Sequence, residues 1–476
     1  MTGLPVAHSK NGGGSRLNKF SIADLRLSIE KWLGPSIGNR QSAIGNTGVL
    51  AVVFFIISSG LSGCAPQSSE PTPLRVWHSL TDREGAFHQL ASRYQKETGI
   101  AVRFELYAPT DIYEQKVRSA AQIDGLPEIY SVMSGEMREL ASFIQAGHVL
   151  SLEETMSRNS DAWRSIFFPR ALAVNTLRPG NPFNVPPGVY GVPLDVMNVQ
   201  IFYNKKLLAA LGVDPLKGPA TWAEFIALGK SAKQQGLIGL VSGWAELWMI
   251  DCFASNYAIH LMGMDKVEAT YQGEVLYTDS DWLKIFSLFA QLRDSGLLAE
   301  GIVSLGNKQA EQLFANERAV FAFNGTWGVN VYKGMNPDLD YGVMMPPPFI
   351  HSRPMVTWGG AGASFVVNAK APRREEAVAF LQWLTAEPQQ RQLTEATQNI
   401  PANRLAASGL PEKLAAFADD MDATVHPRLF SVQEGPTVIE AFDKGIQSIL
   451  IGEATPEEIA QHLEQLKRRE ASLHIP

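Results

Sequence analysis

The chain has 476 residues, enough for about two or three domains, and its 45% hydrophobic and 19% charged residues are typical of a globular protein. Its formal net charge of -7 argues against a nucleic-acid partner. Because Cys64 and Cys252 are its two cysteines, a disulfide scaffold and a cysteine-rich zinc or iron–sulfur site are excluded.

The first 63 residues have the features of a secretory signal. Residues 1–45 carry six basic and two acidic side chains, and no charge follows Arg40 until Glu70. The apolar run at 49–57 between them is shorter than the ~20 residues that span a bilayer. A basic region, a short apolar core and small residues indicate a signal segment at 1–63. Residues 1–40 are long for such a region, and are either an over-extended start or a genuine extra segment.

The sequence Leu-Ser-Gly-Cys at 61–64 resembles a bacterial lipobox. The resemblance implies a lipid on the Cys64 thiol and cleavage before that residue. The alternative is a signal anchor with an incidental cysteine. Residues 64–73, rich in proline and serine, are predicted to form a flexible tether. The nine residues after Cys64 could reach about 30 Å.

The mature chain is predicted to open with alternating strands and helices. Thr81 and Glu84 have the spacing of a capping box, which predicts that a helix begins there. The order β-α-β-α-β predicts a parallel sheet with right-handed crossovers. The predicted elements are strands at 74–77, 100–106 and 128–132, a helix after Thr81 and a helix at 113–122.

The same alternation continues to the end of the chain. Two further capping boxes, at Thr221 and at Thr455, predict helix starts, and Pro456 suits the first position of the last helix. The remaining predicted elements are extended segments at 190–193, 199–203, 319–323 and 364–367.

Motifs of the common enzyme classes are absent from the sequence. It contains no His-Glu-x-x-His pattern, no phosphate loop and no Gly-x-Ser-x-Gly elbow. The glycines at 359–362 do not match a dinucleotide fingerprint, and Cys252 lies among apolar residues that favour an inert thiol. We therefore expect no enzyme activity, no catalytic residue, no metal ligand and no cofactor.

Short motifs along the mature chain have the order and spacing of a known family. They are Tyr-Gly-Val-Pro at 190–193, Phe-Tyr-Asn-Lys-Lys-Leu-Leu at 202–208, Thr-Trp-Ala-Glu-Phe at 221–225, Asn-Gly-Thr-Trp at 324–327 and Trp-Gly-Gly-Ala-Gly at 358–362. This set resembles the extracellular solute-binding proteins of carbohydrate ABC importers, the family that includes maltose- and glycerol-3-phosphate-binding proteins. The resemblance covers residues 74–476.

The resemblance implies an α/β fold of the periplasmic-binding-protein class, type II-like. Two α/β lobes would be joined by a multi-strand hinge, with a ligand cleft between them. The first lobe is expected at 74–195 plus 363–406 and the second at 196–362 plus 407–476. In open parallel sheets, ligands bind beyond the carboxyl ends of the strands, which agrees with such a cleft. Hinge closure around the ligand is typical of this class.

Four ligand-binding candidates belong to the first lobe. His78 and Ser79 end the first strand and are rim candidates. Glu136 follows the third strand, where a simple turn is the alternative. Asp195 lies at the expected hinge, where the alternative to a ligand contact is a hinge hydrogen bond.

The second lobe supplies aromatic candidates for the apolar faces of a sugar. Trp244 and Glu246 belong to the densest cluster, and we expect Trp244 to be the exposed plate and Trp248 to be buried. Trp327 matches the family position most often used for stacking. The remaining candidates are Trp358, which could stack or pack, and Gly359 and Gly360, whose missing side chains would let backbone N–H groups approach the ligand.

The function that these features favour is capture of a sugar by a monomeric, lipid-anchored binding protein that serves an ABC permease. It would lie on the periplasmic or extracellular face of the cell envelope, with Cys64 as its membrane contact. A second possibility keeps the fold but binds glycerol-3-phosphate or a glycerophosphodiester, with Arg353 and Arg404 as the candidate phosphate ligands. A third is a surface lipoprotein that hydrolyses glycans, with two carboxylates drawn from Glu84, Glu136 and Glu246.

Overall fold

A computed structural model describes residues 72–108, 110–132, 137–181, 183–426 and 434–473. The predicted site residues Cys64 and Glu136 therefore lie outside the described residues. Among the described helices, none combines the length and the apolar character that crossing a membrane requires.

The first sheet confirms the predicted β-α-β-α-β opening. Strand β1 lies between β2 and β3 and is parallel to both, with Leu74 opposite Val102 and Val76 opposite Ile129. Strand β12 then pairs antiparallel with β3 and with β6. The strands, in the order β2-β1-β3-β12-β6, are β1 (Leu74–His78), β2 (Val102–Leu106), β3 (Ile129–Val132), β6 (Val192–Pro193) and β12 (Ser364–Val367).

Helix α2 (Glu84–Thr98) begins later than the capping box predicted. A 3-10 turn, η1 (Thr81–Arg83), follows β1, and neither this turn nor α2 has a side-chain cap. The predicted capping box at Thr81 is therefore wrong. The side chain of Arg83 is buried and paired with Asp195, so this turn is shaped by an inward-pointing arginine rather than by a cap.

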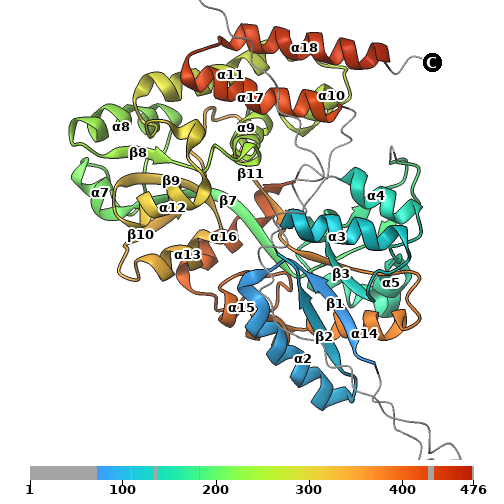
Figure 1. The fold of residues 1–476 in the computed structure, drawn as a ribbon. Helices are drawn as coiled ribbons and strands as arrows, with labels where there is room; N and C mark the ends of the chain where they lie inside the picture. Colours follow the sequence, from blue (N-terminus) through green and yellow to red (C-terminus); the bar gives the residue numbers. More distant parts are fainter. Residues whose placement is uncertain (1–71, 109, 133–136, 182, 427–433, 474–476) are drawn as a thin grey trace, which may run out of the picture. The chain divides into compact units, whose positions relative to one another are not determined.

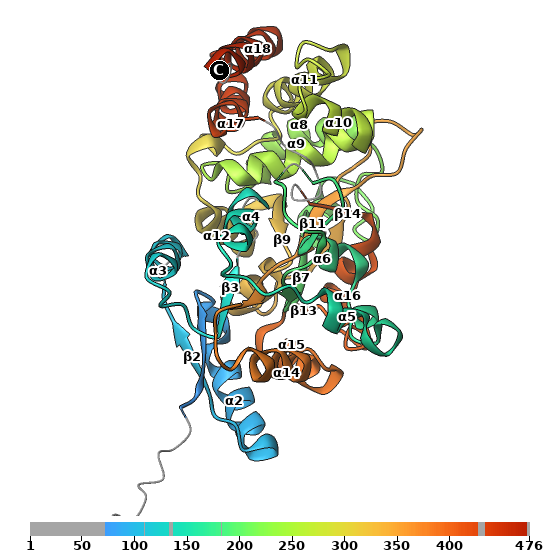
Figure 2. The same ribbon diagram turned by 90° about the vertical axis from the view of Figure 1, so that its right-hand side faces the viewer.

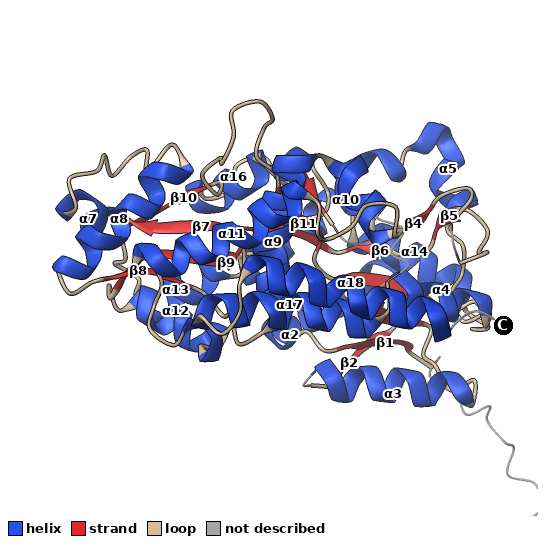
Figure 3. Ribbon diagram, turned by 90° about the horizontal axis from the view of Figure 1, so that it is seen from above, coloured by secondary structure: helices blue, strands red, loops and turns tan. Residues whose placement is uncertain are grey.

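The second sheet is organised around one long strand, β7 (Asp195–Asn204), which is prominent in Figure 3. Its first residues pair with β11 and β13, and its later residues pair with β9 and β10. The other strands are β8 (Ile238–Val241), β9 (Ala319–Gly325), β10 (Tyr341–Met344), β11 (Thr357–Ala361), β13 (Ile400–Pro401) and β14 (Thr424–Val425), and a separate pair is formed by β4 (Thr176–Leu177) and β5 (Gly188–Val189).

The chain passes between the two sheets three times, and two of these passages are short segments. The third leads from β12 of the first sheet to β13, which pairs with β7 of the second. Leu194 alone separates β6 of the first sheet from β7 of the second. The return path runs from β11 to β12 through Gly362 and Ala363. The Leu194 N–H donates to the Ala363 carbonyl at 2.8 Å, so the two crossings are hydrogen-bonded to each other.

Helices flank both sheets (Figures 1 and 2). Helix α2 packs on β2 and α14 on β12, whereas α8, α9 and α12 pack on strands of the second sheet. The helices before β7, and those between β12 and β13, are α2, α3 (Thr110–Gln122), α4 (Met137–Gln145), α5 (Glu153–Asp161), η2 (Arg164–Ile166), α6 (Pro169–Ala173), α14 (Arg374–Leu384) and α15 (Glu387–Thr397). The others are α7 (Lys205–Ala210), α8 (Trp222–Gln234), α9 (Leu247–Met262), α10 (Met264–Tyr271), α11 (Ser280–Ser295), η3 (Ile302–Ser304), α12 (Asn307–Ala315), α13 (Gly328–Met335), α16 (Glu412–Asp419), η4 (Met421–Ala423), α17 (Pro436–Ile451) and α18 (Pro456–Leu473).

Two of the predicted helix starts are confirmed by their hydrogen bonds. At α18 the Thr455 hydroxyl accepts from the Glu458 N–H at 3.2 Å, and Glu458 accepts from the Thr455 N–H at 2.9 Å. At α8 the Thr221 hydroxyl accepts from the Glu224 N–H, but the Glu224 carboxylate binds the N–H of Ala220 instead. Each arrangement satisfies backbone donors that a helix start leaves unpaired.

Candidate functional site

The carboxyl end of β1 places His78 and Ser79 inside the protein. The His78 ring is fully buried and lies edge-on to Phe87 and Phe104, with centroids 5.0 and 5.8 Å away. Its Nδ1 accepts a hydrogen bond from the Leu80 N–H at 3.2 Å. Ser79 is buried as well. A ligand contact from either residue stays a prediction.

We predict that His78 makes the fold sensitive to acid. Burial, reinforced by the Arg83 charge, lowers the pKa of His78 to about 4 from an ordinary value of about 6.5. Between about pH 6.5 and pH 4 the unfolded chain therefore binds a proton that the folded chain does not, which costs up to about 3 kcal/mol of stability. The variant His78→Asn keeps an acceptor for the Leu80 N–H, and we expect it to flatten the decline in melting temperature across this range. Parallel declines in the two proteins would contradict the prediction.

Asp195 opens β7 at the crossing between the sheets and is held by the protein itself. Its carboxylate is buried and forms an ion pair with Arg83. The same carboxylate accepts from the Ala363 N–H at 2.8 Å, and the Asp195 carbonyl accepts from the Gly362 N–H at 3.1 Å. Burial raises the pKa of Asp195, and the guanidinium of Arg83 opposes that rise. These contacts correspond to the hinge hydrogen bond, and a ligand contact stays a prediction.

The exposure of Trp244 and Trp248 is the reverse of the expectation. Trp244 is 0% exposed and packs against Phe253 and Phe289, with ring centroids 5.4 and 6.1 Å away. Trp248 is 41% exposed. The prediction of an exposed Trp244 and a buried Trp248 is therefore wrong. Trp244 lies three residues after β8 and packs against Phe253 of α9, whereas Trp248 lies in the first turn of that helix.

Trp248, Trp327 and Trp358 come together in a cluster that we call the tryptophan platform. The ring centroid of Trp248 lies 5.7 Å from that of Trp327 and 6.3 Å from that of Trp358. The three side chains come from α9, from the turn after β9 and from β11. Trp248 is exposed, Trp327 is half-buried and Trp358 is 8% exposed. Indole faces grouped in this way can pack on the C–H faces of a sugar ring.

Carboxylates fix the indoles of the tryptophan platform. Glu246 accepts a hydrogen bond from the Trp248 indole at 3.2 Å and another from the Asn307 N–H at 2.9 Å. The buried Glu311 accepts from the Asn307 amide at 2.9 Å and is hydrogen-bonded to the Trp327 side chain. Burial raises the pKa of Glu311, and these hydrogen bonds oppose the rise. Glu246 is thus beside the platform, where its role is to orient an indole.

The glycines near the platform are required by packing within the protein. A Cβ on Gly325 would overlap the ring of Trp327. A Cβ on Gly359 would lie 2.5 Å from the Met197 carbonyl oxygen, because β7 pairs closely with β11 there. Gly360 has a φ of +145°, which disfavours a side chain. Strand packing accounts for Gly359 and Gly360, and their predicted approach to a ligand stays a prediction.

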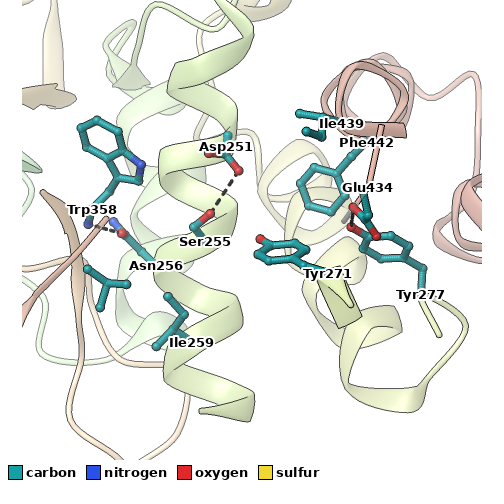
Figure 4. Close-up of a pocket in the computed structure, with 11 residues that line it drawn as sticks. Asp251, Ser255, Asn256, Ile259, Tyr271, Tyr277, Trp358, Glu434, Ile439 and Phe442 are labelled. Atoms are coloured by element: carbon teal, nitrogen blue, oxygen red, sulfur yellow. Dashed lines mark hydrogen bonds between the residues drawn. The ribbon is translucent and has the colours of Figure 1, made fainter. Parts of the chain in front are cut away.

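A small cavity of about 90 Å³ adjoins the platform at Trp358 (Figure 4). Asp251 and Asn256 of α9 line it on one side. Tyr271 and Tyr277 line it on the other side. In the described part of the chain, no group of three His, Cys, Asp or Glu side chains could hold a metal ion.

Sequence reasoning did not identify Trp248, Arg83 and Asn307 as residues that build this region. The sequence feature that could have identified Trp248 as a residue of this region is its position two residues after Glu246, at the start of a helix. Arg83 gave no signal, because its partner Asp195 is 112 positions further along the chain. Asn307 contributes its backbone N–H as well as its side chain, and backbone groups carry no mark in a sequence.

A model of the bacterial extracellular solute-binding protein family matches residues 89–422. The multiple sugar-binding protein of Streptococcus mutans is 26% identical over 210 residues, which are 43% of this chain and 49% of that protein. The chain thus spans about half the length of this relative. Among solved structures, a chitin oligosaccharide binding protein has a TM-score of 0.68 and 20% identity, over 83% of this chain and 98% of that one. The GacH receptor of Streptomyces glaucescens, solved unliganded and with acarbose, has a TM-score of 0.65 and 21% identity, over 83% and 97% of the two chains.

Proposed function

Because this chain belongs to the bacterial extracellular solute-binding protein family, we propose that it captures a carbohydrate and delivers it to the permease of an ABC importer. Its relatives are binding proteins of transport systems rather than enzymes, and the family acts outside the cytoplasm. The tryptophan platform is the observation that carries the proposal. It joins three indoles from separate segments, and carboxylates hold two of them, Trp248 and Trp327, in place.

The chemistry of a sugar suits this arrangement. A pyranose has apolar C–H faces that pack on indoles, and hydroxyls that need planar polar partners such as carboxylates and amides. Glu246 and Asn307 lie beside Trp248 and Trp327, so both kinds of partner are available within one small region. A glycerol phosphate is favoured less, because Arg353 donates to the Leu261 carbonyl at 2.5 Å.

We assign the two lobes of the binding protein as 74–195 plus 363–406 and 196–362 plus 407–476. The adjacent crossings at Leu194 and at 362–363 support a hinge at this place. Each crossing is only one or two residues long, so a change in a few backbone torsion angles would move one sheet relative to the other. The sugar would lie between the lobes, with Asp195 and Arg83 at the back of the cleft.

Calorimetry of the chain from residue 65 onward tests the proposal. The panel contains neutral mono-, di- and trisaccharides, glycerol-3-phosphate and a glycerophosphodiester. We expect micromolar or tighter binding of at least one saccharide, corresponding to about -8 kcal/mol. Binding of a glycerol phosphate alone, or of no member of the panel, would overturn the proposed ligand class.

We further propose that Cys64 carries a lipid that holds a monomeric protein at the membrane. The supporting observation is the charge-free apolar run that ends in Leu-Ser-Gly-Cys. A fatty acid analogue supplied to cells should label the wild type and leave Cys64→Ser unlabelled. Cys252→Ser is the control, since Cys252 is a buried free thiol and its loss should leave labelling intact. Equal labelling of Cys64→Ser and the wild type would refute the anchor.

A further inference from the structure

The cavity next to Trp358 contains a carboxylate, Asp251, that has no cationic partner among the described residues. Asp251 is partly exposed and belongs to the lining of the cavity. The Ser255 hydroxyl donates a hydrogen bond to the Asp251 carboxylate at 3.1 Å. No basic side chain in the described ranges pairs with Asp251. Burial raises the pKa of Asp251 to about 6, and burial together with the Asp251 charge raises that of Asp443.

A second, independent observation is an unsatisfied donor in the same wall. Asn256 is 1% exposed, and its Oδ1 accepts from the Trp358 N–H at 2.5 Å. Asn256 belongs to the lining of the cavity, and its Nδ2 has no hydrogen-bond partner among the described residues. A buried amide donor without a partner costs stability, so it favours a ligand acceptor in the cavity.

The remaining walls are mostly aromatic (Figure 4). Tyr271, Tyr277 and Phe442 lie across from Asp251, and Trp358 belongs to the lining on the other side of α9. The other carboxylate of the lining, Glu434, is neutralised by Lys467 at 2.8 Å and accepts from the Tyr277 hydroxyl at 2.9 Å. Aromatic faces combined with one uncompensated carboxylate are the environment that binds an organic ammonium group.

We propose that this cavity receives a protonated amine, so that the chain prefers saccharides that carry a free amino group. The inference rests on the proposed carbohydrate function. A sugar ring packed on the tryptophan platform would direct its amino substituent past Trp358 to Asp251. The Nδ2 of Asn256 would donate to a neighbouring hydroxyl oxygen. A neutral sugar would leave the carboxylate uncompensated and would bind more weakly.

Calorimetry near pH 7 with three matched disaccharides tests the proposal: the β-1,4-linked glucosamine dimer, its N-acetylated counterpart and cellobiose. We expect the free amine to bind about tenfold or more tightly than either neutral compound. Asp251→Asn should remove this preference, because the amine loses its counter-charge and a neutral sugar no longer faces an uncompensated carboxylate. Asp265→Asn, an exposed charge on α10, is the matched control and should keep the preference.

The comparison in the wild type decides the proposal even if Asp251→Asn fails to fold. Neutral disaccharides that bind as tightly as the amine would overturn the amine preference and leave the carbohydrate function standing. A preference that persists in a folded Asp251→Asn protein would overturn the role of the cavity. If no saccharide binds, both proposals fail.

Discussion

Replacing Asp195 by alanine is expected to lower the free energy of unfolding by about 3–5 kcal/mol. The substitution leaves the buried guanidinium of Arg83 without its counter-charge and removes the acceptor for the Ala363 N–H. Urea denaturation followed by circular dichroism measures the loss. Asp82→Ala is the matched control, because Asp82 contacts the same guanidinium at 3.3 Å from an exposed position and should cost less than about 1 kcal/mol.

The double variant Arg83→Met, Asp195→Leu separates an unpaired charge from a general loss of packing. Replacing both partners with apolar groups of similar size removes the uncompensated charge, so much of the lost stability should return. If Asp195→Ala and the double variant are equally unstable, the ion pair is not the cause. A loss below about 1 kcal/mol in Asp195→Ala would contradict the prediction outright.

Trp327→Ala is expected to weaken binding of the saccharide found by calorimetry by about thirtyfold, or ~2 kcal/mol. The half-buried indole packs on Gly325 and on Trp248, so its loss removes part of the tryptophan platform and leaves one sugar face wet. This expectation rests on the proposed carbohydrate function. An unchanged dissociation constant in a folded Trp327→Ala protein would refute the stacking role.

Trp244→Ala is the matched control for that experiment. Trp244 is fully buried in the core, so its truncation should cost about 3–5 kcal/mol of folding stability. The melting temperature without ligand distinguishes the two tryptophans. We expect a large decrease for Trp244→Ala and a small one for Trp327→Ala.

The local elements were predictable from the sequence because they depend on neighbouring residues. Alternating apolar residues located β1, β2 and β3, and the Thr-x-x-Glu spacing located the start of α18. The same spacing was misleading at Thr81. At that place the turn is shaped by the ion pair between Arg83 and Asp195. A local sequence pattern contains no information about a partner so far along the chain.

The site was less predictable than the fold because side-chain exposure depends on tertiary packing. Trp244 and Trp248 lie four residues apart in the sequence. That spacing and the surrounding residues are compatible with a core position or a surface position for either tryptophan. Only the packing of Trp244 on Phe253 and Phe289 decides which of the two is exposed. The arrangement of Trp327 and Trp358 around Trp248 likewise depends on strands β9 and β11 reaching the same end of α9.

The direction of β1 has a mechanical consequence for a tethered protein. The chain enters this strand at Leu74, shortly after the proposed anchor, and leaves it at His78, roughly 13 Å further on. A pulling force from the membrane would therefore act on the amino end of the first sheet. It would reach β7 through the three passages between the sheets, at Leu194, at 362–363 and between β12 and β13. The half of the molecule that contains the tryptophan platform would not be pulled directly. It could therefore rotate during ligand capture while the other half stays attached to the membrane.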